Sequence, residues 1–294
     1  MDLVVGATGL LGTEVCRLLR MRGEQVRALV RKSSEPAKIE ALSRLGVELQ
    51  DGDLKDLPSL RAACAGVHSV ITTATATLSR AEGDSIDTVD AQGTLDLIAA
   101  ASAAGVQHFV FTSLVPIDMH VPLQNAKRAA ERALADGSMP WTVLQPGHFF
   151  EVWFSPGLGF DLAAGTAKIH GAGQRALQWI SYKDVARVAA AVIERGPHRR
   201  VLQFGGPEAL SQREVIALVE RTTRRKLQLE EGSDAALRDA YEAAKDPLEK
   251  TFAAFMLTCS TGDPQRLDND CVRGLLDQPL SSIQHMVDSA VTTQ

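Results

Sequence analysis

The most informative stretch of this chain is Gly6-Ala7-Thr8-Gly9-Leu10-Leu11-Gly12. It follows a short apolar run at residues 3–5, of the length of one buried strand, and it leads into residues 13–20, where apolar side chains recur at helical spacing. A strand, a glycine turn and a helix in this order direct backbone N–H groups and the positive end of the helix at one spot, where a pyrophosphate can bind. An ordinary turn between a strand and a helix is the alternative. We predict dinucleotide binding by Gly6, Thr8, Gly9, Leu10, Leu11 and Gly12.

The composition is that of a globular protein with a sizeable core. The chain has 294 residues, 45% of them hydrophobic, and a formal net charge of −5, whereas proteins that bind nucleic acid are usually basic. Its four cysteines and seven histidines show no metal-ligand spacing. No apolar stretch has the length of a membrane span, and the first strand starts too close to Met1 for a signal peptide. We expect a cytoplasmic monomer or homodimer without metal, nucleic-acid or membrane partners.

Strand and helix patterns alternate along the first half of the chain. Strands are predicted near residues 3–5, 25–30, 47–50, 67–72, 108–112 and 141–144, and helices near residues 11–20, 36–45, 57–65, 84–104 and 126–135. Strands and helices in alternation build a parallel sheet with helices on both faces. With right-handed crossovers the result is an α/β fold, a Rossmann-type doubly wound parallel sheet.

The sequence changes character after Pro146-Gly147. Aromatic residues gather in 149–154, and glycines mark an irregular region beyond them. Strand and helix patterns then return before a mainly helical end. We predict a dinucleotide-binding domain over residues 1–150, to which strand–helix units from about 176–205 return, and a smaller, discontinuous C-terminal substrate lobe over residues 151–294.

The end of the second predicted strand selects the nucleotide. An acidic residue there binds the ribose 2′-hydroxyl of NAD, whereas an arginine accommodates the 2′-phosphate of NADP. This strand ends Ala28-Leu29-Val30-Arg31-Lys32, with no acid at its tip. Arg31 can form paired hydrogen bonds with a phosphate, and Lys32 adds positive charge, so the pattern predicts NADPH/NADP⁺. Two exposed basic residues at a strand end are the alternative.

Two further strand ends follow the predicted path of the cofactor. Asp53 and Leu54 come after the third strand, where Asp53 can accept a hydrogen bond from the adenine amino group while Leu54 packs on the ring. A helix cap at Asp53 or Asp56 is equally compatible with the pattern. Thr73 and Ala74 come after the fourth strand and are small enough to lie beside the ribose and the phosphates.

Several stretches in this order resemble the NmrA-like branch of the atypical short-chain dehydrogenases/reductases, over roughly residues 2–225. Besides the glycine turn they are Val30-Arg31, Gly52-Asp53-Leu54, Phe111-Thr112-Ser113, Leu144-Gln145-Pro146-Gly147-His148-Phe149, Trp179-Ile180-Ser181-Tyr182-Lys183-Asp184-Val185-Ala186 and Gly205-Gly206-Pro207-Glu208-Ala209-Leu210-Ser211. The resemblance implies the Rossmann fold and NADPH as cofactor. It implies less about the substrate, because the family includes reductases of quinones, imines, dyes and isoflavones as well as redox-sensing regulators with little catalysis.

One departure from the superfamily pattern bears on catalysis. Typical members use a Tyr-x-x-x-Lys pair, in which the tyrosine donates a proton and the lysine holds the nicotinamide ribose. In Leu123-Gln124-Asn125-Ala126-Lys127 the lysine is present, but leucine stands in place of the tyrosine. The resemblance implies that Lys127 binds the ribose hydroxyls or donates the proton itself, and a solvated helix lysine is the alternative. Ser113 matches the catalytic serine of the superfamily, with a helix cap or turn contact as its alternative.

Residues after position 115 complete the candidate site. The resemblance implies that Pro146, Gly147 and Phe149 contact the nicotinamide end of the cofactor. It also places His148 near the reactive carbon, unless this histidine is only a packed neighbour. His120 is a weaker acid and substrate-binding candidate. An apolar pocket for a flat substrate is predicted from Phe150, Trp153 and Phe154, although core packing explains each of them equally well.

Together these residues predict an NADPH-dependent reductase that transfers hydride to a small, flat or apolar electrophile without the usual tyrosine acid. A quinone, imine, carbonyl or activated alkene fits this description. The alternative is a non-catalytic regulatory protein that senses NADP(H) and acts through a protein partner. The missing tyrosine argues against an isomerase or epimerase with bound cofactor.

Overall fold

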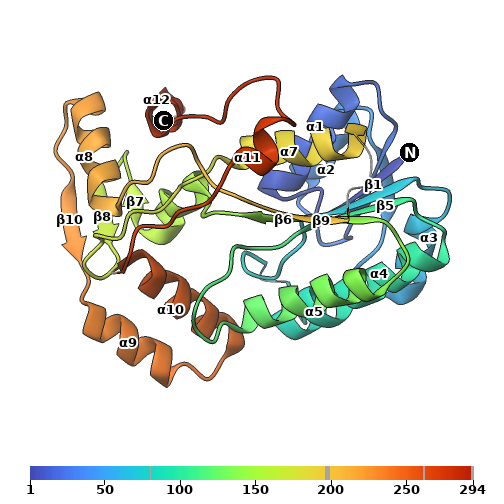
Figure 1. The fold of residues 1–294 in the computed structure, drawn as a ribbon, viewed down its shortest axis with the longest axis horizontal. Helices are drawn as coiled ribbons and strands as arrows, with labels where there is room; N and C mark the ends of the chain where they lie inside the picture. Colours follow the sequence, from blue (N-terminus) through green and yellow to red (C-terminus); the bar gives the residue numbers. More distant parts are fainter. Residues whose placement is uncertain (80, 196–198, 261, 293–294) are drawn as a thin grey trace. The chain divides into compact units, whose positions relative to one another are not determined.

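The structure of the protein is a computed structural model that describes residues 1–79, 81–195, 199–260 and 262–292 (Figure 1). The chain divides into two compact units. The first unit contains Met1–Leu114, Leu123–Gln145 and Val185–Leu202, and the second contains Val115–Pro122, Pro146–Asp184 and Gln203–Gln294. Residues 115–122 therefore group with the second unit, whereas the boundary predicted near residue 150 left them in the first domain.

The main sheet of the described chain has seven strands. In spatial order they are β3 (Glu48–Asp51), β2 (Val26–Val30), β1 (Asp2–Val5), β4 (Ser69–Thr72), β5 (His108–Thr112), β6 (Trp141–Pro146) and β9 (Arg200–Phe204). The five ladders that join β3 to β6 are parallel, so the predicted doubly wound parallel sheet is confirmed. The order in which strands are added reverses at β1: β2 and β3 lie on one side of it, and β4, β5 and β6 lie on the other. Parallel sheets of this kind bind ligands at the carboxyl ends of the strands beside the reversal, here β1 and β4.

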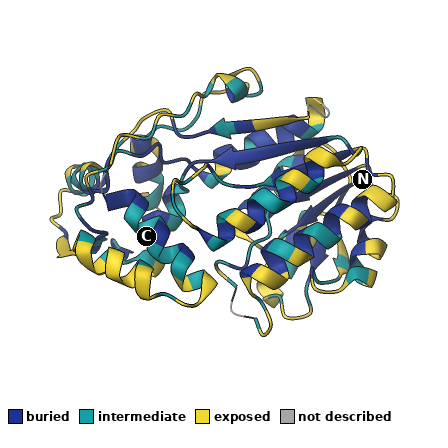
Figure 2. Cartoon of the chain, turned by 60° about the horizontal axis from the view of Figure 1, so that its bottom comes forward, coloured by how far each residue is buried: buried dark blue, intermediate teal, exposed yellow. Residues whose placement is uncertain are grey.

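Helices cover both faces of this sheet. Figure 1 shows α1 (Leu10–Met21) and α7 (Tyr182–Arg195) on one side, and α4 (Thr94–Ala103) and α5 (Pro122–Asp136) on the other. The shorter helices α2 (Pro36–Arg44) and α3 (Leu57–Cys64) follow β2 and β3 along the chain. Figure 2 shows buried residues along the strands and on the helix faces turned toward them, as the alternating pattern predicts.

The helix predicted over residues 84–104 does not have α-helical geometry throughout. It begins with a π-helical segment, Ile86–Gly93, and becomes α-helical only from α4 onward. A Cβ at Gly93 would lie 2.8 Å from the carbonyl oxygen of Thr88, so this segment requires glycine at its end. In this segment the side chain of Asp90 is fully buried. Segments of π-helix are frequent at functional sites, and the contacts of Asp90 are described below.

The second unit combines helices with a small mixed sheet that the sequence did not predict. Its strands are β7 (Phe160–Asp161), β8 (Thr166–Ile169) and β10 (Gln228–Glu231), and its helical segments are α6 (Phe150–Trp153), η2 (Pro156–Leu158), α8 (Gln212–Thr223), α9 (Asp234–Ala243), α10 (Pro247–Ser260), α11 (Asp270–Arg273) and α12 (Ile283–Thr292). Strand β8 pairs in parallel with β10 and antiparallel with β7. Strand β7 is very short and all four residues of β10 are exposed, so neither strand shows an apolar alternation.

Each unit has its own hydrophobic core. Phe109, Phe111 and Leu134 lie in the core of the first unit, and Trp179 and Phe150 lie in that of the second. None of the helices in the described ranges is long and apolar enough to cross a membrane.

Candidate functional site

The glycine turn after β1 has the geometry that the sequence predicts. Gly6 has a φ of +82°, a conformation that side-chain-bearing residues rarely adopt. A Cβ at Gly12 would lie only 2.2 Å from the carbonyl oxygen of Gly6. Glycine at position 12 therefore lets α1 pack directly against the turn. The hydroxyl of Thr13 holds this arrangement by donating to the carbonyl of Ala7 at 2.8 Å.

The first turn of α1 offers backbone donors to a ligand. Gly9 is the residue before the helix, and among the described residues no side chain caps it. Thr8 is half-buried, and Gly9 and Leu10 are exposed, so the residues at the start of the helix are open to an approaching anion. The side chain of Leu11 is 6% exposed, and it can therefore contact a cofactor only through its backbone.

The end of β4 lies directly against the glycine turn. Thr73 donates its backbone N–H to Val5 at 2.9 Å, and its hydroxyl is 3.3 Å from the carbonyl oxygen of Gly6. A Cβ at Gly6 would meet the backbone nitrogen of Ala74 at 2.8 Å. The structure thus brings Thr73 and Ala74, predicted to lie beside the cofactor, next to the predicted phosphate-binding turn.

Lys127, on α5, reaches the same place from the interior. Its ammonium donates to the carbonyl of Ala74 at 3.3 Å, lies 3.3 Å from Oδ1 of Asp90, and sits 5.0 Å from the ring centre of Phe111. Lys127 is only 5% exposed, so the alternative of a solvated helix lysine is wrong. Buried charges are normally paired, and Asp90 is the partner here.

Sequence reasoning missed Asp90, which comes from the π-helical segment. Its Oδ2 accepts the backbone N–H of Ala76 at 2.9 Å, so the carboxylate holds both the chain after β4 and the ammonium of Lys127. The sequence offered one signal for Asp90, namely an acidic residue inside an apolar helix pattern. This signal does not show which residue pairs with the acid.

Ser113 takes part in a polar network of the first unit. Its hydroxyl accepts from Arg128 at 3.2 Å, and Arg128 also donates to the carbonyl of Leu114 and pairs with Glu131. Ser113 is 6% exposed. This placement fits the turn-contact alternative, and a catalytic role of Ser113 stays a prediction. Leu123, at the tyrosine position, is buried with 4% exposure.

The residues predicted for the adenosine end have mixed placements. Lys32 is exposed, and Arg31 is half-buried at the tip of β2. Oδ1 of Asp53 accepts the backbone N–H of Lys55 at 2.9 Å, which is a turn contact. Asp56 is the residue before α3, and in the described chain its side chain does not cap that helix. The side chain of Leu54 is 6% exposed and lies in the core cluster. Leu54 therefore has little side-chain surface for an adenine ring, contrary to the prediction.

The second unit contains a cavity of about 480 Å³ with a mixed lining. Its wall includes the apolar residues Val115, Pro116, Ile117, Met119, Leu177 and Leu257 and the polar residues Asp118, His148, Arg175, Arg238, Tyr241, Glu242, Thr258 and Gln265. His120 is exposed and adjoins this wall, because its carbonyl accepts the hydroxyl of Tyr241 at 2.8 Å. Cavities of this size are typical of small-molecule sites.

His148 is the histidine of that cavity. Its ring lies 5.2 Å from Trp153 and 5.8 Å from Trp179, both edge-on, and its Nε2 is 3.4 Å from the hydroxyl of Thr258. Among the described residues its buried Nδ1 has no hydrogen-bond partner. Burial, helped by the positive charge of Arg175, lowers the pKa of His148 to about 4. The ring is therefore neutral at pH 7, with one donor and one acceptor nitrogen.

This shifted pKa predicts a pH dependence of stability. In the unfolded chain the pKa of histidine is about 6.5, whereas folded His148 titrates near pH 4. Between these values protons bind the unfolded state preferentially, so the free energy of unfolding falls as the pH drops from 6.5 to 4. His148→Gln should lose less stability than wild type over this range, as measured by thermal unfolding at several pH values. The control His285→Gln, which removes an exposed histidine of α12, should keep the wild-type slope; equal slopes for all three proteins would contradict the prediction.

The aromatic residues predicted to form a substrate pocket lie elsewhere. Phe150, Trp153 and Phe154 are 2%, 7% and 9% exposed and belong to the core cluster of the second unit. None of them lines the cavity, so the alternative of core packing describes them. Phe149 is half-buried.

Pro146 and Gly147 are also buried. The N–H of Gly147 donates to Phe204 at 2.8 Å, and a Cβ at Gly147 would lie 2.8 Å from the carbonyl oxygen of Gln178. Backbone packing within the second unit therefore requires glycine here, and contact of these residues with the cofactor stays a prediction.

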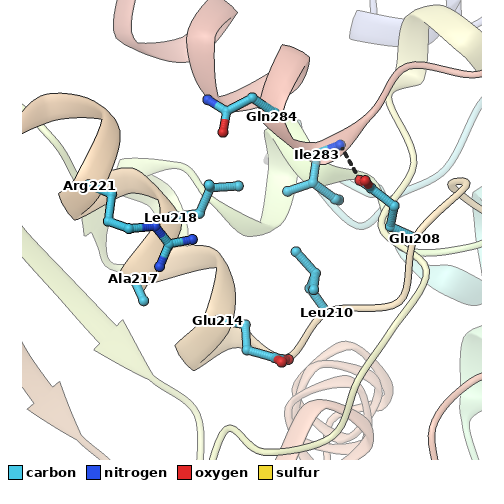
Figure 3. Close-up of a pocket in the computed structure, with 8 residues that line it drawn as sticks. All are labelled: Glu208, Leu210, Glu214, Ala217, Leu218, Arg221, Ile283 and Gln284. Carbon is cyan, nitrogen blue, oxygen red and sulfur yellow. Dashed lines mark hydrogen bonds between the residues drawn. The ribbon is translucent and has the colours of Figure 1, made fainter.

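A second hollow of about 450 Å³ lies along α8 and the start of α12 (Figure 3). Its carboxylates already have structural roles. Glu208 accepts the N–H of Ile283 at 2.8 Å, and Glu214 caps α8 together with Ser211. Both carboxylates are therefore engaged within the protein rather than available to a ligand. Elsewhere too, the described residues contain no cluster of three metal-ligating side chains.

Comparison with known proteins finds a matching family model, related sequences and solved structures of the same fold. Residues 3–271 match the family model described as the NmrA-like family. An NAD(P)H azoreductase of Xenophilus azovorans is 32% identical over 226 residues, covering 74% of this chain and 72% of that protein. The photosystem II assembly factor Ycf39 of Guillardia theta is 30% identical over 227 residues, covering 76% and 70%. An NADPH-dependent quinone oxidoreductase of Escherichia coli, solved with NADPH, has a TM-score of 0.76 at 24% identity, covers 99% and 100% of the two chains, and shares the fold.

Proposed function

Because this chain belongs to the NmrA-like family, we propose that it is an NADPH-dependent reductase whose cofactor lies along the carboxyl ends of β1, β2 and β4. The resemblance seen in the sequence is thereby confirmed, and the reductase activity is what we infer from the site. The named relative that reduces azo compounds with NAD(P)H supports this choice.

One observation carries the proposal. The glycine turn, the uncapped start of α1, and Thr73–Ala74 adjoin one another, and Lys127 reaches them from the interior. Accessible backbone N–H groups at a helix start fit a pyrophosphate. The ammonium of Lys127, which donates to the carbonyl of Ala74, fits the ribose hydroxyls. The residues present therefore fit a dinucleotide.

When bound, NADPH supplies the hydride. The chain would contribute binding and orientation, with the first turn of α1 holding the phosphates and Lys127 holding the nicotinamide ribose. Since Leu123 offers no proton, the proton would come from Lys127, from water or after release of the product. A quinone or another electrophile that needs little acid assistance suits this arrangement.

The cavity of the second unit is our proposed substrate site. Its apolar wall suits a flat or apolar body, and neutral His148 together with Arg175 and Tyr241 offers polar groups that can orient an electrophile.

The activity test is direct. Purified protein is mixed with NADPH and each member of a panel of quinones, imines, carbonyls and activated alkenes, and loss of NADPH absorbance is followed. We expect oxidation with at least one class. Tight NADPH binding without turnover of any compound would contradict the reductase proposal.

NADPH binding without turnover would favour a regulatory protein. The assembly factor among the relatives and the buried leucine at the tyrosine position both favour this second candidate. A partner protein that is captured with NADPH and released with NADP⁺, or the reverse, would support it directly.

The role of Arg31 gives a separate prediction. Arg31→Gln is expected to weaken NADPH binding by about tenfold or more while changing NADH binding less, because a charge-assisted contact with the 2′-phosphate is lost. Calorimetric titration with both nucleotides measures this. Arg44→Gln, which removes an exposed arginine of α2, serves as the control. An equal loss for both nucleotides would show that Arg31 does not recognise the 2′-phosphate.

A further inference from the structure

A buried carboxylate pairs with the arginine at the end of β2. The side chain of Asp84 is 1% exposed, and its Oδ2 accepts from Nη1 of Arg31 at 2.5 Å. The ammonium of Lys55 and the hydroxyl of Ser79 bind the same carboxylate. These residues come from three separate segments of the first unit, namely the ends of β2 and β3 and the chain before the π-helical segment.

The carboxylate is held in its charged form. Burial would raise the pKa of Asp84, but hydrogen bonds from Lys55, Ser79 and Arg31 outweigh it and lower the pKa below its usual value. At pH 7 the cluster therefore contains a fixed negative charge between two cations. Asp53 lies 3.7 Å from Lys55 and adds a further carboxylate on its other side.

Arg31 is only partly occupied by this contact. Within the part of the chain that the structure describes, one of the three guanidinium nitrogens of Arg31, Nη1, contacts a protein group. The side chain of Arg31 is 34% exposed. Nε and Nη2 therefore remain available to a ligand. A phosphate bound there, however, would lie beside the negative charge of Asp84, and like charges held close together repel strongly.

We propose that Asp84 is a specificity-determining residue that reduces the preference of this site for NADPH over NADH. The tip of β2 has no acidic residue of its own, and Asp84 supplies the missing negative charge by tertiary contact. The charge opposes a 2′-phosphate, which carries nearly two negative charges, but it leaves an uncharged 2′-hydroxyl almost unaffected. This inference rests on the proposed dinucleotide binding and adds that both NADH and NADPH are accepted.

The experiment compares nucleotide affinities by calorimetry, without a substrate. Wild type, Asp84→Asn and the control Asp87→Asn are each titrated with NADPH and with NADH. Asp87 is an exposed acid three residues further along the chain, so its variant removes the same charge away from the cluster. We expect Asp84→Asn to tighten NADPH binding by about tenfold with NADH binding nearly unchanged, and the control to behave as wild type.

The possible outcomes separate the two proposals. If wild type binds neither nucleotide, both proposals fail. If wild type binds them but the ratio of the two dissociation constants is unchanged in Asp84→Asn, or NADPH binds more weakly, the inference alone is overturned. Circular dichroism checks that the variant folds, and Asp84→Ser, which keeps an oxygen acceptor for Lys55, replaces it if it does not. Lys55→Gln should shift the ratio in the opposite direction, toward NADH.

Discussion

Asp90→Asn is expected to lower the free energy of unfolding by about 3–5 kcal/mol, the cost of leaving one partner of a buried ion pair without its counter-charge. Asp90 is fully buried, and the side chain of Lys127 is 6% exposed. Asparagine keeps the volume and can still accept the N–H of Ala76, so the change isolates the charge. Urea unfolding followed by circular dichroism measures it.

A double-mutant cycle separates the pair from other effects. Lys127→Met alone leaves a buried carboxylate and should also be strongly destabilising. The double variant leaves neither charge and should lose less stability than the sum of the singles by at least about 1 kcal/mol. Glu40→Gln, which breaks the exposed pair with Arg44, is the control and should change stability by no more than about 0.5 kcal/mol. A similarly small change in stability for Asp90→Asn would contradict the prediction that this buried pair contributes strongly to the free energy of unfolding.

Gly12→Ala should have the second large effect, on nucleotide binding and on stability together. The added Cβ would lie 2.2 Å from the carbonyl oxygen of Gly6 and 2.9 Å from the Cα of Ala7. Both are backbone atoms, so no side chain can rotate away and α1 must move relative to the turn. We expect a loss of about 1–3 kcal/mol of stability and at least about hundredfold weaker NADPH binding, because the N–H groups of the first helical turn leave their positions.

Gly274→Ala is the matched control. Position 274 has a negative φ and open space around its Cβ direction, so alanine there should leave nucleotide affinity unchanged. Calorimetry with NADPH and thermal unfolding on the same preparations give both readouts. If Gly12→Ala binds NADPH like wild type, the glycine turn is not the phosphate site.

The main sheet was predictable because its signals are local. Apart from β3, which is mostly polar and exposed, each strand of the first unit from β1 to β6 contains a short apolar run followed by a turn. Gly6 and Gly12 define the conformation of the glycine turn. The small sheet of the second unit was not predictable, because the exposed residues of β10 show neither apolar alternation nor a turn signal. The same limit applies to Phe150 and Trp153. An aromatic cluster identifies a packed region, but not whether it surrounds a core or a ligand.

The fold, the glycine turn after β1 and the presence of a lysine without its tyrosine could all be predicted from the sequence, since each depends on residues adjacent along the chain. The electrostatic partners, by contrast, became apparent only in the folded chain. Asp90 meets Lys127 and Asp84 meets Arg31 across long sequence separations. An ion pair depends on distance and burial, which arise when strands and helices pack, and a list of residues contains neither. The sequence therefore predicted a basic site for NADPH, and the fold places the carboxylate of Asp84 against its arginine.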